Sequence, residues 1–592
     1  MPLNPNGKID KPALPFPDTA QASYAAPMTS KNSTERKLQA IWTSILPNAP
    51  QPIPTDESFF DLGGHSILAT RLIFEIRKVF VIDAPLGLVF EESTIAGLVR
   101  AVDALRNRDL GIAQPSMAGG LALPKPNAPA PLEYGQDYHL LCEKLQSSYP
   151  SPASIGSRSV TVFLTGATGF LGAFILQELL SRKTRVEKVI CLVRASSAQQ
   201  GLERLMQGSN DRGAWDDDWL QSGRLEVVAG DLNLEFFGLG NDTWRRIAEE
   251  ADVVLHNGAL VHWVFPYEKL RAPNVLATMT AIDLASTAKP KFLVFVSSTS
   301  AIDTDYYVKL SESLASYPPN QRGISESDDL DGAKTDLKTG YGQSKWVSEK
   351  LLFEAGKRGL RGHIVRPGYV VGHSKTAGTL GVFFLLRCLG NKNLVTVTNT
   401  DDFLWRLVKG CIQLGLVPDI NNTVNMVPVD HVARCTALAA ISPLPHATFS
   451  VLHISANPLP TFNDMLSSLS HYGFPTEVCE YVIWRRKLEQ HVLDVQDNAL
   501  FPLLHFVLDD LPTSTRAPEL NDSNTTELLK QDNDNDDVGS LTCTVDDTLM
   551  GLYLAWLIGA KFLPPPSMSN PSKVLPTLLN SEGIKASGRT GL

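Results

Sequence analysis

Tyr341 and Lys345, in the stretch YGQSK, stand four residues apart, a spacing that places both side chains on one face of a helix. An ammonium beside a phenol lowers the pKa of the phenol, which would let Tyr341 act as a proton donor near neutral pH. Thr299 follows the apolar run KFLVFVSS, which is typical of a strand, and would supply a hydroxyl to the same carbonyl oxygen. Unless the helical pair is a coincidence, the three residues predict acid catalysis at a carbonyl.

A second group of residues could bind phosphate. VTVFLTGATGFLGAFILQELL, from Val160 to Leu180, has the pattern of a strand, a glycine turn and a helix. Glycines let the backbone approach a pyrophosphate, and the start of the helix offers unpaired amides to the anion. The spacing is GxxGxxG instead of the common GxGxxG, so on its own it would equally suit an ordinary strand-to-helix turn. The predicted cofactor-binding residues of the turn are Gly166, Ala167, Thr168, Gly169, Phe170, Leu171 and Gly172.

The residue after the second predicted strand indicates which dinucleotide binds. NAD-preferring folds often place a carboxylate there for the ribose hydroxyls, whereas Arg194 suits a 2′-phosphate and favours NADPH. Arg204, about three helical turns later, could join it, although either arginine alone could be an ordinary surface charge. We expect the adenine and its ribose to lie against Asp231, Leu232, Asn257, Gly258 and Ala259.

Strands alternate with helices beyond the glycine turn. The apolar stretches KVICLV, LEVVAGDL, ADVVLHNGA, KFLVFVSS and GHIVRPG follow VTVFL, with helical runs between them. This rhythm predicts an α/β fold, a Rossmann-type doubly wound parallel sheet covered on both faces, with a smaller and mostly helical substrate subdomain behind it. The acidic stretch PTSTRAPELNDSNTTELLKQDNDNDDVG predicts a mobile loop without a direct role.

The segment before the sheet predicts a small all-α bundle. In FFDLGGHSILATRLIFEIRKVF, apolar residues repeat every four positions from Leu68 to Phe80, so Ser66 begins an amphipathic helix. A serine there could be a simple N-cap. DLGGHS also resembles the attachment motif of acyl and peptidyl carrier domains, in which this serine carries 4′-phosphopantetheine. A hydroxyl at a helix N-terminus tolerates the charge of the incoming phosphodiester.

Composition excludes several classes of function. The chain has 592 residues, 43% hydrophobic and 20% charged, and a net charge of −10, which argues against a nucleic-acid partner. No apolar run is long enough to predict a membrane span, and the N-terminus lacks a secretory signal. Seven cysteines without CxxC spacing predict no metal site and a reducing, cytoplasmic compartment.

Several motifs together resemble known families. The region from about Thr161 to Pro367 resembles the extended short-chain dehydrogenase/reductases, and more closely the thioester reductase domains that follow carrier domains. NGKID near the N-terminus resembles the closing motif of adenylate-forming domains, whose lysine, here Lys8, contacts the acyl-adenylate. This order is similar to the C-terminal part of the fungal large-subunit L-2-aminoadipate reductases of lysine biosynthesis. The stretches NPNGKIDKPALPFPDTA, NTDDFLWRLVKGCIQLGLVPDINNTVNMVPVDHVARC and GLYLAWLIGAKFLPPP carry that similarity.

The resemblance implies a reaction and roles. In that family NADPH reduces a carrier-bound thioester, the tyrosine protonates the oxyanion, and an aldehyde and a free thiol result. Thr299, Tyr341 and Lys345 would form the triad, Pro367 and Gly368 would pass close to the nicotinamide. Asn274 would support the active site, or would simply be a buried polar residue. The implied partners are a phosphopantetheinyl transferase, an amino-dicarboxylic acid, and an adenylation domain in cis or in trans.

Two alternatives stay open at this point. The chain could reduce another acid in secondary metabolism, or it could be a non-catalytic acyl carrier, because residues 377–398 have no counterpart in the family pattern and could block the acyl pocket. The expected organisation is an adenylation-domain tail (1–30), a carrier domain (31–106), a linker (107–150), an NADP-binding reductase domain (151–398), its substrate-binding part (399–566) and a poorly ordered tail (567–592).

Overall fold

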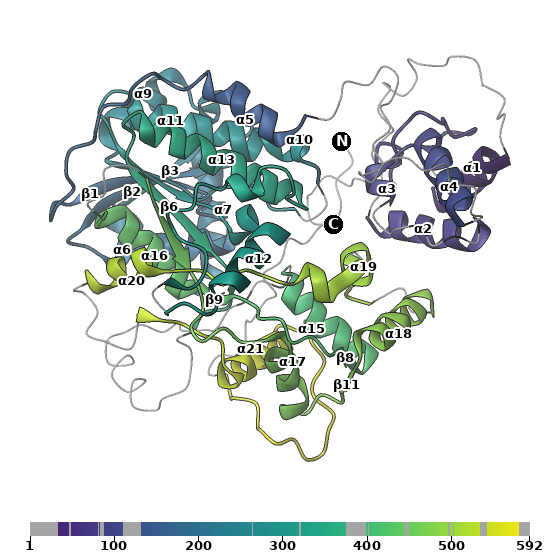
Figure 1. The fold of residues 1–592 in the computed structure, drawn as a ribbon. Helices are drawn as coiled ribbons and strands as arrows, with labels where there is room; N and C mark the ends of the chain where they lie inside the picture. Colours follow the sequence, from purple (N-terminus) through teal and green to yellow (C-terminus); the bar gives the residue numbers. More distant parts are fainter. Residues whose placement is uncertain are drawn as a thin grey trace. The chain divides into compact units, whose positions relative to one another are not determined.

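The chain forms two compact units in the computed structural model, Met1–Gly120 with Phe501–Asp509, and Leu121–Leu500 with Asp510–Leu592 (Figure 1). The structure describes residues 33–46, 49–64, 66–80, 82, 84, 88–109, 132–262, 265–318, 321–374, 398, 400, 402–444, 449–494, 498–500, 503–532 and 541–578. The NGKID motif with Lys8, His65, and residues 377–397 of the unmatched segment lie outside this part of the chain.

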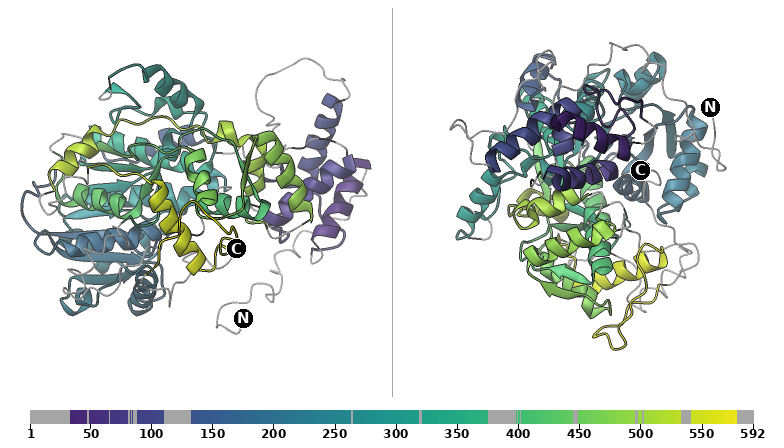
Figure 2. Two further views of the ribbon diagram at one scale, coloured as in Figure 1. Left: turned by 90° about the horizontal axis from the view of Figure 1, so that it is seen from below. Right: turned by 90° about the vertical axis from the view of Figure 1, so that its right-hand side faces the viewer.

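The first unit is a helical bundle, which confirms the predicted all-α carrier fold (Figure 2). Its core holds Leu72 and Ile76, because their spacing turns one face of their helix inward. The rings of Trp42 and Phe59 meet edge to face in the same core, with centroids 5.0 Å apart. The helices of the bundle are α1 (Ser33–Ile45), α2 (Ser66–Phe80), α3 (Leu88–Glu91) and α4 (Ile95–Asp109).

A seven-stranded sheet forms the centre of the second unit, in the order β10-β6-β5-β4-β1-β2-β3. Every neighbouring pair is parallel, which confirms the predicted fold class. The strand order reverses between β1 and β4, and this switch point is where such sheets bind dinucleotides. The strands are β1 (Val160–Thr165), β2 (Val186–Val193), β3 (Leu225–Ala229), β4 (Val253–His256), β5 (Phe292–Val296), β6 (Gly362–Pro367) and β10 (Ser450–Ile454).

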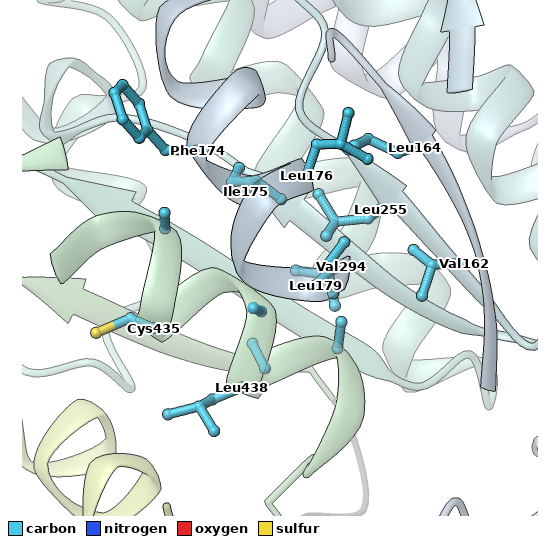
Figure 3. Packing of buried hydrophobic residues seen from close by; sticks show 14 of the residues in the cluster. Val162, Leu164, Phe174, Ile175, Leu176, Leu179, Leu255, Val294, Cys435 and Leu438 are labelled. Atoms are coloured by element: carbon cyan, nitrogen blue, oxygen red, sulfur yellow. The ribbon is translucent and has the colours of Figure 1, made fainter. Parts of the chain in front are cut away.

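Different helices cover the two faces of this sheet. Val162 and Leu164 of β1 join one buried cluster with Leu179 of α6 and Leu438 of α16 (Figure 3). Phe163, whose side chain alternates to the other face, joins a second cluster. The first cluster contains residues of α6 (Phe170–Ser181), α7 (Ala198–Asn210) and α16 (Val429–Ile441); the second contains residues of α5 (Tyr134–Cys142), α9 (Asn241–Glu250), α11 (Ala277–Ser286) and α13 (Gly340–Lys357).

Two of these elements lie beyond the predicted boundary at residue 399. Strand β10 pairs with β6, and α16 packs on α6, so both complete the sheet layer although they lie in the span predicted as the substrate-binding part. Nearly every residue of α16 is buried, so its sequence lacks the one-sided apolar pattern of a surface helix.

The remaining elements are shorter or lie in the C-terminal part. The helical ones are α8 (Asp218–Gln221), η3 (Glu235–Gly238), α10 (Tyr267–Leu270), η4 (Arg271–Leu276), η5 (Thr299–Ile302), α12 (Asp305–Leu314), η7 (Asp331–Ala333), α15 (Phe403–Leu414), α17 (Phe462–His471), α18 (Tyr481–Asp494), α19 (Leu504–Ser514), α20 (Ser523–Lys530) and α21 (Asp547–Gly559). Two parallel two-stranded sheets join β7 (Tyr369–Val371) to β9 (Met426–Pro428) and β8 (Leu416–Pro418) to β11 (Glu477–Cys479).

The prediction of a mobile loop for the acidic stretch is wrong for its residues up to 532. Helix α20 forms within it, and the buried Asp532 carboxylate accepts hydrogen bonds from Arg182 (2.9 Å) and Arg434 (2.7 Å). Composition missed this because a buried carboxylate between two guanidiniums is a tertiary contact. The first residues of the predicted tail are also bound to the rest of the unit, since the amides of Ser567 and Met568 donate to Gly473 O.

Replacement of Leu179 by alanine should lower the free energy of unfolding by about 3 kcal/mol, because the cavity between α6 and the sheet cannot close fully. Urea unfolding of the whole chain, followed by circular dichroism, measures this. Leu140→Ala is the matched control: Leu140 is 56% exposed and its truncation should change stability little. Equal losses in the two variants would contradict the packing described here.

Candidate active site

The glycine turn after β1 is packed so tightly that side chains do not fit. Gly166 has φ +76°, and its carbonyl accepts a hydrogen bond from Gly169 N (3.0 Å) before α6 begins. A Cβ on Gly172 would lie 2.0 Å from Gly166 O, and one on Gly166 would lie 2.7 Å from Gly258 Cα. The start of α6 is thereby held against the carboxyl ends of β1 and β4 with its backbone bare. This cradle fits the pyrophosphate of a dinucleotide.

The structure brings the residues predicted for the adenosine to the same edge of the sheet. Asn257 Nδ2 donates to Gly166 O (3.2 Å), and Gly258 N donates to Thr165 Oγ1 (2.9 Å). Leu232 lies so close that a Cβ on Gly258 would sit 2.8 Å from its Cδ1. Asp231 is half-buried, and its Oδ1 accepts hydrogen bonds from the backbone and side chain of Asn233. Ala259 is half-buried on the same loop.

The two predicted arginines also come together. Arg194 lies just beyond β2 and is exposed, and Arg204 Nη1 on α7 donates to Arg194 O (2.7 Å). The contact fixes Arg204 beside the end of β2, the position that binds the adenosine ribose in this fold.

A buried histidine that sequence reasoning missed joins β1 to β4. Thr165 Oγ1 accepts from Gly258 N (2.9 Å) and also shares a hydrogen bond with His256 Nδ1, 2.8 Å away. Burial, with the charge of Lys345 adding to it, lowers the pKa of His256 to about 3, so the ring is neutral. This chain of hydrogen bonds holds Gly258 against the glycine turn.

The predicted catalytic residues meet at the carboxyl end of β5. Lys345 of α13 is buried, and its Nζ donates to Val296 O (2.7 Å), the last residue of that strand. The same ammonium lies 4.6 Å from the centre of the Phe295 ring and 5.8 Å from that of Tyr341. Thr299 begins η5 three residues beyond Val296. One lysine thus ties the helix of Tyr341 to the strand that leads to Thr299.

The predicted pKa of the tyrosine is wrong in direction. Burial raises the pKa of Tyr341 well above its usual value, because the phenolate is costly to desolvate. Burial also lowers the pKa of Lys345 to about 7, although the carboxylate of Glu349 opposes this. The phenol is therefore fully protonated at neutral pH, and the lysine is the group whose charge changes there.

Glu349, one helical turn after Lys345, binds Ser297, the residue that follows Val296. Its carboxylate accepts from Ser297 Oγ (2.5 Å) and from Arg366 of β6 through Nε and Nη2 (2.9 and 2.6 Å), and Glu349 and Arg366 are fully buried. Arg366 Nη1 also bonds His453 Nε2 of β10 (2.9 Å). The sequence spacing Lys345–Glu349 was the available signal for this network, but its partners lie on distant strands.

Asn274 connects the site to the helix layer. It lies in η4, a stretch of π-helix, and its Oδ1 accepts from Leu260 N (2.8 Å) while Nδ2 donates to Ser344 Oγ (2.9 Å). The side chain thus fixes the loop after β4 to the turn of α13 between Tyr341 and Lys345. Such π-bulges often occur at functional sites.

The π-helix is held in turn by α5, which lies in the span predicted as the linker 107–150. The buried Asp137 carboxylate accepts from Arg271 Nε and Nη2 (2.7 and 2.8 Å) and from Tyr267 OH (2.5 Å). Tyr134 OH donates to Ala333 O (2.7 Å). Residues 132–149 therefore pack as part of the second unit, since their buried polar groups are matched by partners more than a hundred positions away.

The last predicted cofactor residues, Pro367 and Gly368, lie at the end of β6. Gly368 N donates to Ile454 O (3.2 Å), and a Cβ on Gly368 would lie 2.3 Å from Asn425 O. Pro367 is buried beside it. Both lie at the carboxyl edge that also holds the glycine turn and Val296, since all of these strands are parallel.

In the first unit, Ser66 is the first residue of α2, as predicted. The turn before it is tight: Gly63 has φ +94°, and Gly64 N donates to Phe59 O (2.8 Å). A Cβ on Gly64 would lie 2.3 Å from the Phe59 ring, so only glycine fits between the turn and the core.

Each of the two units matches a known protein family. Residues 164–436 match the family described as male sterility protein, and residues 36–102 match the phosphopantetheine attachment site. Over the whole chain, the sequence is 48% identical to the L-2-aminoadipate reductase of Schizosaccharomyces pombe, of which it covers 40%. The solved structure of the terminal R domain of the myxalamid PKS-NRPS pathway is 30% identical in sequence and has a TM-score of 0.60. The match includes all of that domain and 73% of this chain. The chain belongs to the family of this terminal R domain, and its whole length is similar to a part of the L-2-aminoadipate reductases.

This family member spans about two fifths of the length of the curated relatives it matches. An archaeal thiolation-reductase di-domain, 20% identical with a TM-score of 0.63, has the same fold over 90% of the chain. Among the described residues, no helix is both long and apolar enough to cross a membrane, and no group of three or more His, Cys, Asp or Glu side chains could hold a metal ion.

Replacement of Gly172 by alanine should weaken binding of the nicotinamide cofactor about tenfold or more, because the new methyl must push α6 away from Gly166 O at a cost of about 1–3 kcal/mol. Fluorescence titration of the purified chain with NADPH measures the affinity. Gly240→Ala is the control, since a Cβ there meets nothing within 4 Å. Unchanged affinity in the Gly172 variant would contradict a role for the turn.

Proposed function

We propose that this chain reduces an acyl thioester, carried on a phosphopantetheine arm at Ser66, to an aldehyde with NADPH. The observation that carries the proposal is the position of Tyr341 and Lys345, which the Lys345–Val296 contact (2.7 Å) sets at the sheet edge of the glycine turn. The attachment-site match at residues 36–102, which includes Ser66, supports the carrier role.

Each residue of the site then has a task. NADPH, when bound, supplies a hydride to the thioester carbonyl carbon. Tyr341 donates its phenolic proton to the carbonyl oxygen, and Thr299 donates a hydrogen bond to the same oxygen. The ammonium of Lys345, 5.8 Å from the ring centre, stabilises the phenolate that remains. The resulting hemithioacetal loses the thiol of the arm and leaves the aldehyde.

We further propose that the acyl group is L-2-aminoadipoyl and the product L-2-aminoadipate 6-semialdehyde. The names of the relatives from Schizosaccharomyces pombe (48% identical) and Penicillium chrysogenum (45%) support this choice. The reaction requires a phosphopantetheinyl transferase and an adenylation domain, in cis or in trans. The free cysteines of the described chain support a reducing, cytoplasmic compartment.

In this proposal the parts of the chain have adjusted boundaries. Residues 31–106 are the carrier domain. The reductase begins at 132, and its NADP-binding layer includes α16 and β10 as well as residues 151–374. The substrate-binding part consists of the other elements between 402 and 566, with the tail after them.

The test is the decay of NADPH absorbance after Ser66 has been loaded with aminoadipoyl-phosphopantetheine. Loaded wild type should oxidise NADPH, and Tyr341→Phe should be slower by a factor of about 10²–10⁴, because the proton donor is lost. Ser66→Ala should accept no arm. No decay on a carrier shown by mass spectrometry to be loaded would contradict the function with this acid.

The rate should also fall as pH rises through about 7, because the Lys345 ammonium loses its proton there. Initial rates between pH 5.5 and about 9 on the loaded carrier measure this limb. Lys345→Arg keeps the positive charge over the whole range, so any activity it retains should lack the limb. A limb unchanged in that variant would assign it to another group.

A further inference from the structure

The loop that follows β4 is held against the start of α13 at two points. The side chain of Asn274 bonds both the backbone N (2.8 Å) and O (3.1 Å) of Leu260, and it also bonds Ser344 Oγ (2.9 Å). Gly340, the first residue of α13, lies against the other end of the loop, because a Cβ there would be 2.4 Å from Phe265 O. Residues 260–265 therefore run along the first turn of α13.

This turn of α13 carries Tyr341, so the loop passes beside the residue proposed as the proton donor. Its stretch LVHWVF, residues 260–265, contains no Asp, Glu, Lys or Arg. Val261 is apolar but 49% exposed, and the rings of His262 and Phe265 stack with their centroids 3.6 Å apart. Loops at the carboxyl ends of parallel strands are the places where such folds contact their ligands. The loop thus offers an uncharged and partly apolar surface next to Tyr341.

Lys269 of α10 places one positive charge beside this surface. Its Nζ lies 5.6 Å from the centre of the Phe265 ring. The side chain is exposed, and within the described ranges no carboxylate forms an ion pair with it. The neighbouring Glu268 instead accepts a hydrogen bond from Leu132 N (3.1 Å). An ammonium in this situation attracts phosphate.

4′-Phosphopantetheine has its chemical groups in the matching order. From the thiol that holds the acyl group, an uncharged chain with two amides and a pair of methyl groups leads to a phosphate. With the thioester at Tyr341, the uncharged chain would face Val261 and the phosphate would face Lys269. The acyl group itself does not fit this surface, because aminoadipoyl ends in an ammonium and a carboxylate, which an uncharged loop would leave unpaired.

We propose that the loop 260–265 and Lys269 form the binding site of the phosphopantetheine arm in the second unit. Val261 contacts the uncharged chain of the arm, and Lys269 pairs with its phosphate. This inference rests on the proposed function, because it places the thioester at Tyr341. The competing role is structural: the loop would only support the start of α13.

The experiment is saturation-transfer NMR on the whole chain, with 4′-phosphopantetheine and pantetheine as the probes. The chain is produced without a phosphopantetheinyl transferase, so that Ser66 carries no arm. Wild type should bind both probes. Val261→Asp should weaken the binding of both about fivefold or more, because a carboxylate replaces the apolar contact. Lys269→Gln should weaken 4′-phosphopantetheine about two- to fivefold and leave pantetheine unchanged, since only the phosphate faces the lysine.

Val478→Asp and Lys487→Gln, at exposed positions on β11 and α18, are the matched controls and should bind both probes like wild type. Circular dichroism checks the fold of each variant, and Val261→Ser replaces Val261→Asp if the latter does not fold. Equal effects of Lys269→Gln on the two probes, or no effect of the Val261 substitution, would overturn the assignment. A wild-type chain that binds neither probe would do the same. A chain that binds both probes but oxidises no NADPH on a loaded carrier would instead count against the proposed function.

Discussion

A single buried ammonium organises the catalytic edge of this protein. Lys345 donates to Val296 O, and this contact joins the helix of Tyr341 to the strand end that leads to Thr299. Glu349, one turn later, accepts a hydrogen bond from Ser297, so α13 is bound to the last residue of β5 and to the residue after it. Because a buried charge is costly unless its partners are exact, the network selects one register of helix against strand.

The other half of the site is fixed by the absence of side chains instead of by charge. Gly166, Gly172 and Gly258 lie in contacts too close for a Cβ atom, and the Thr165–His256 hydrogen bond links the ends of the paired strands β1 and β4. The first half therefore depends on electrostatics and the second on steric fit. Both halves meet at one edge because the sheet is parallel throughout, which places all strand ends together.

Local pattern was enough to predict the elements that carry the site. The β-rich runs, the glycine turn and the YGQSK helix are signals that lie within a few neighbouring residues, and the structure has the corresponding strands and helices. What the sequence could not indicate are contacts between distant segments, such as Asp532 with Arg182, Asp137 with Arg271, and the pairing of β10 with β6. The pKa of Tyr341 failed for a similar reason: spacing reveals a neighbouring cation, but burial depends on the whole fold.

The clasp between α5 and the π-helix bears on how such proteins could be recombined. Asp137, near the entry of the chain into the reductase, is bound to Arg271, three residues before Asn274. A second unit cut out after α5 would lose the support of Asn274 while keeping Thr299, Tyr341 and Lys345. Exchange of carrier and reductase parts between relatives should therefore use a junction ahead of Leu132, so that the helix travels with the sheet it supports.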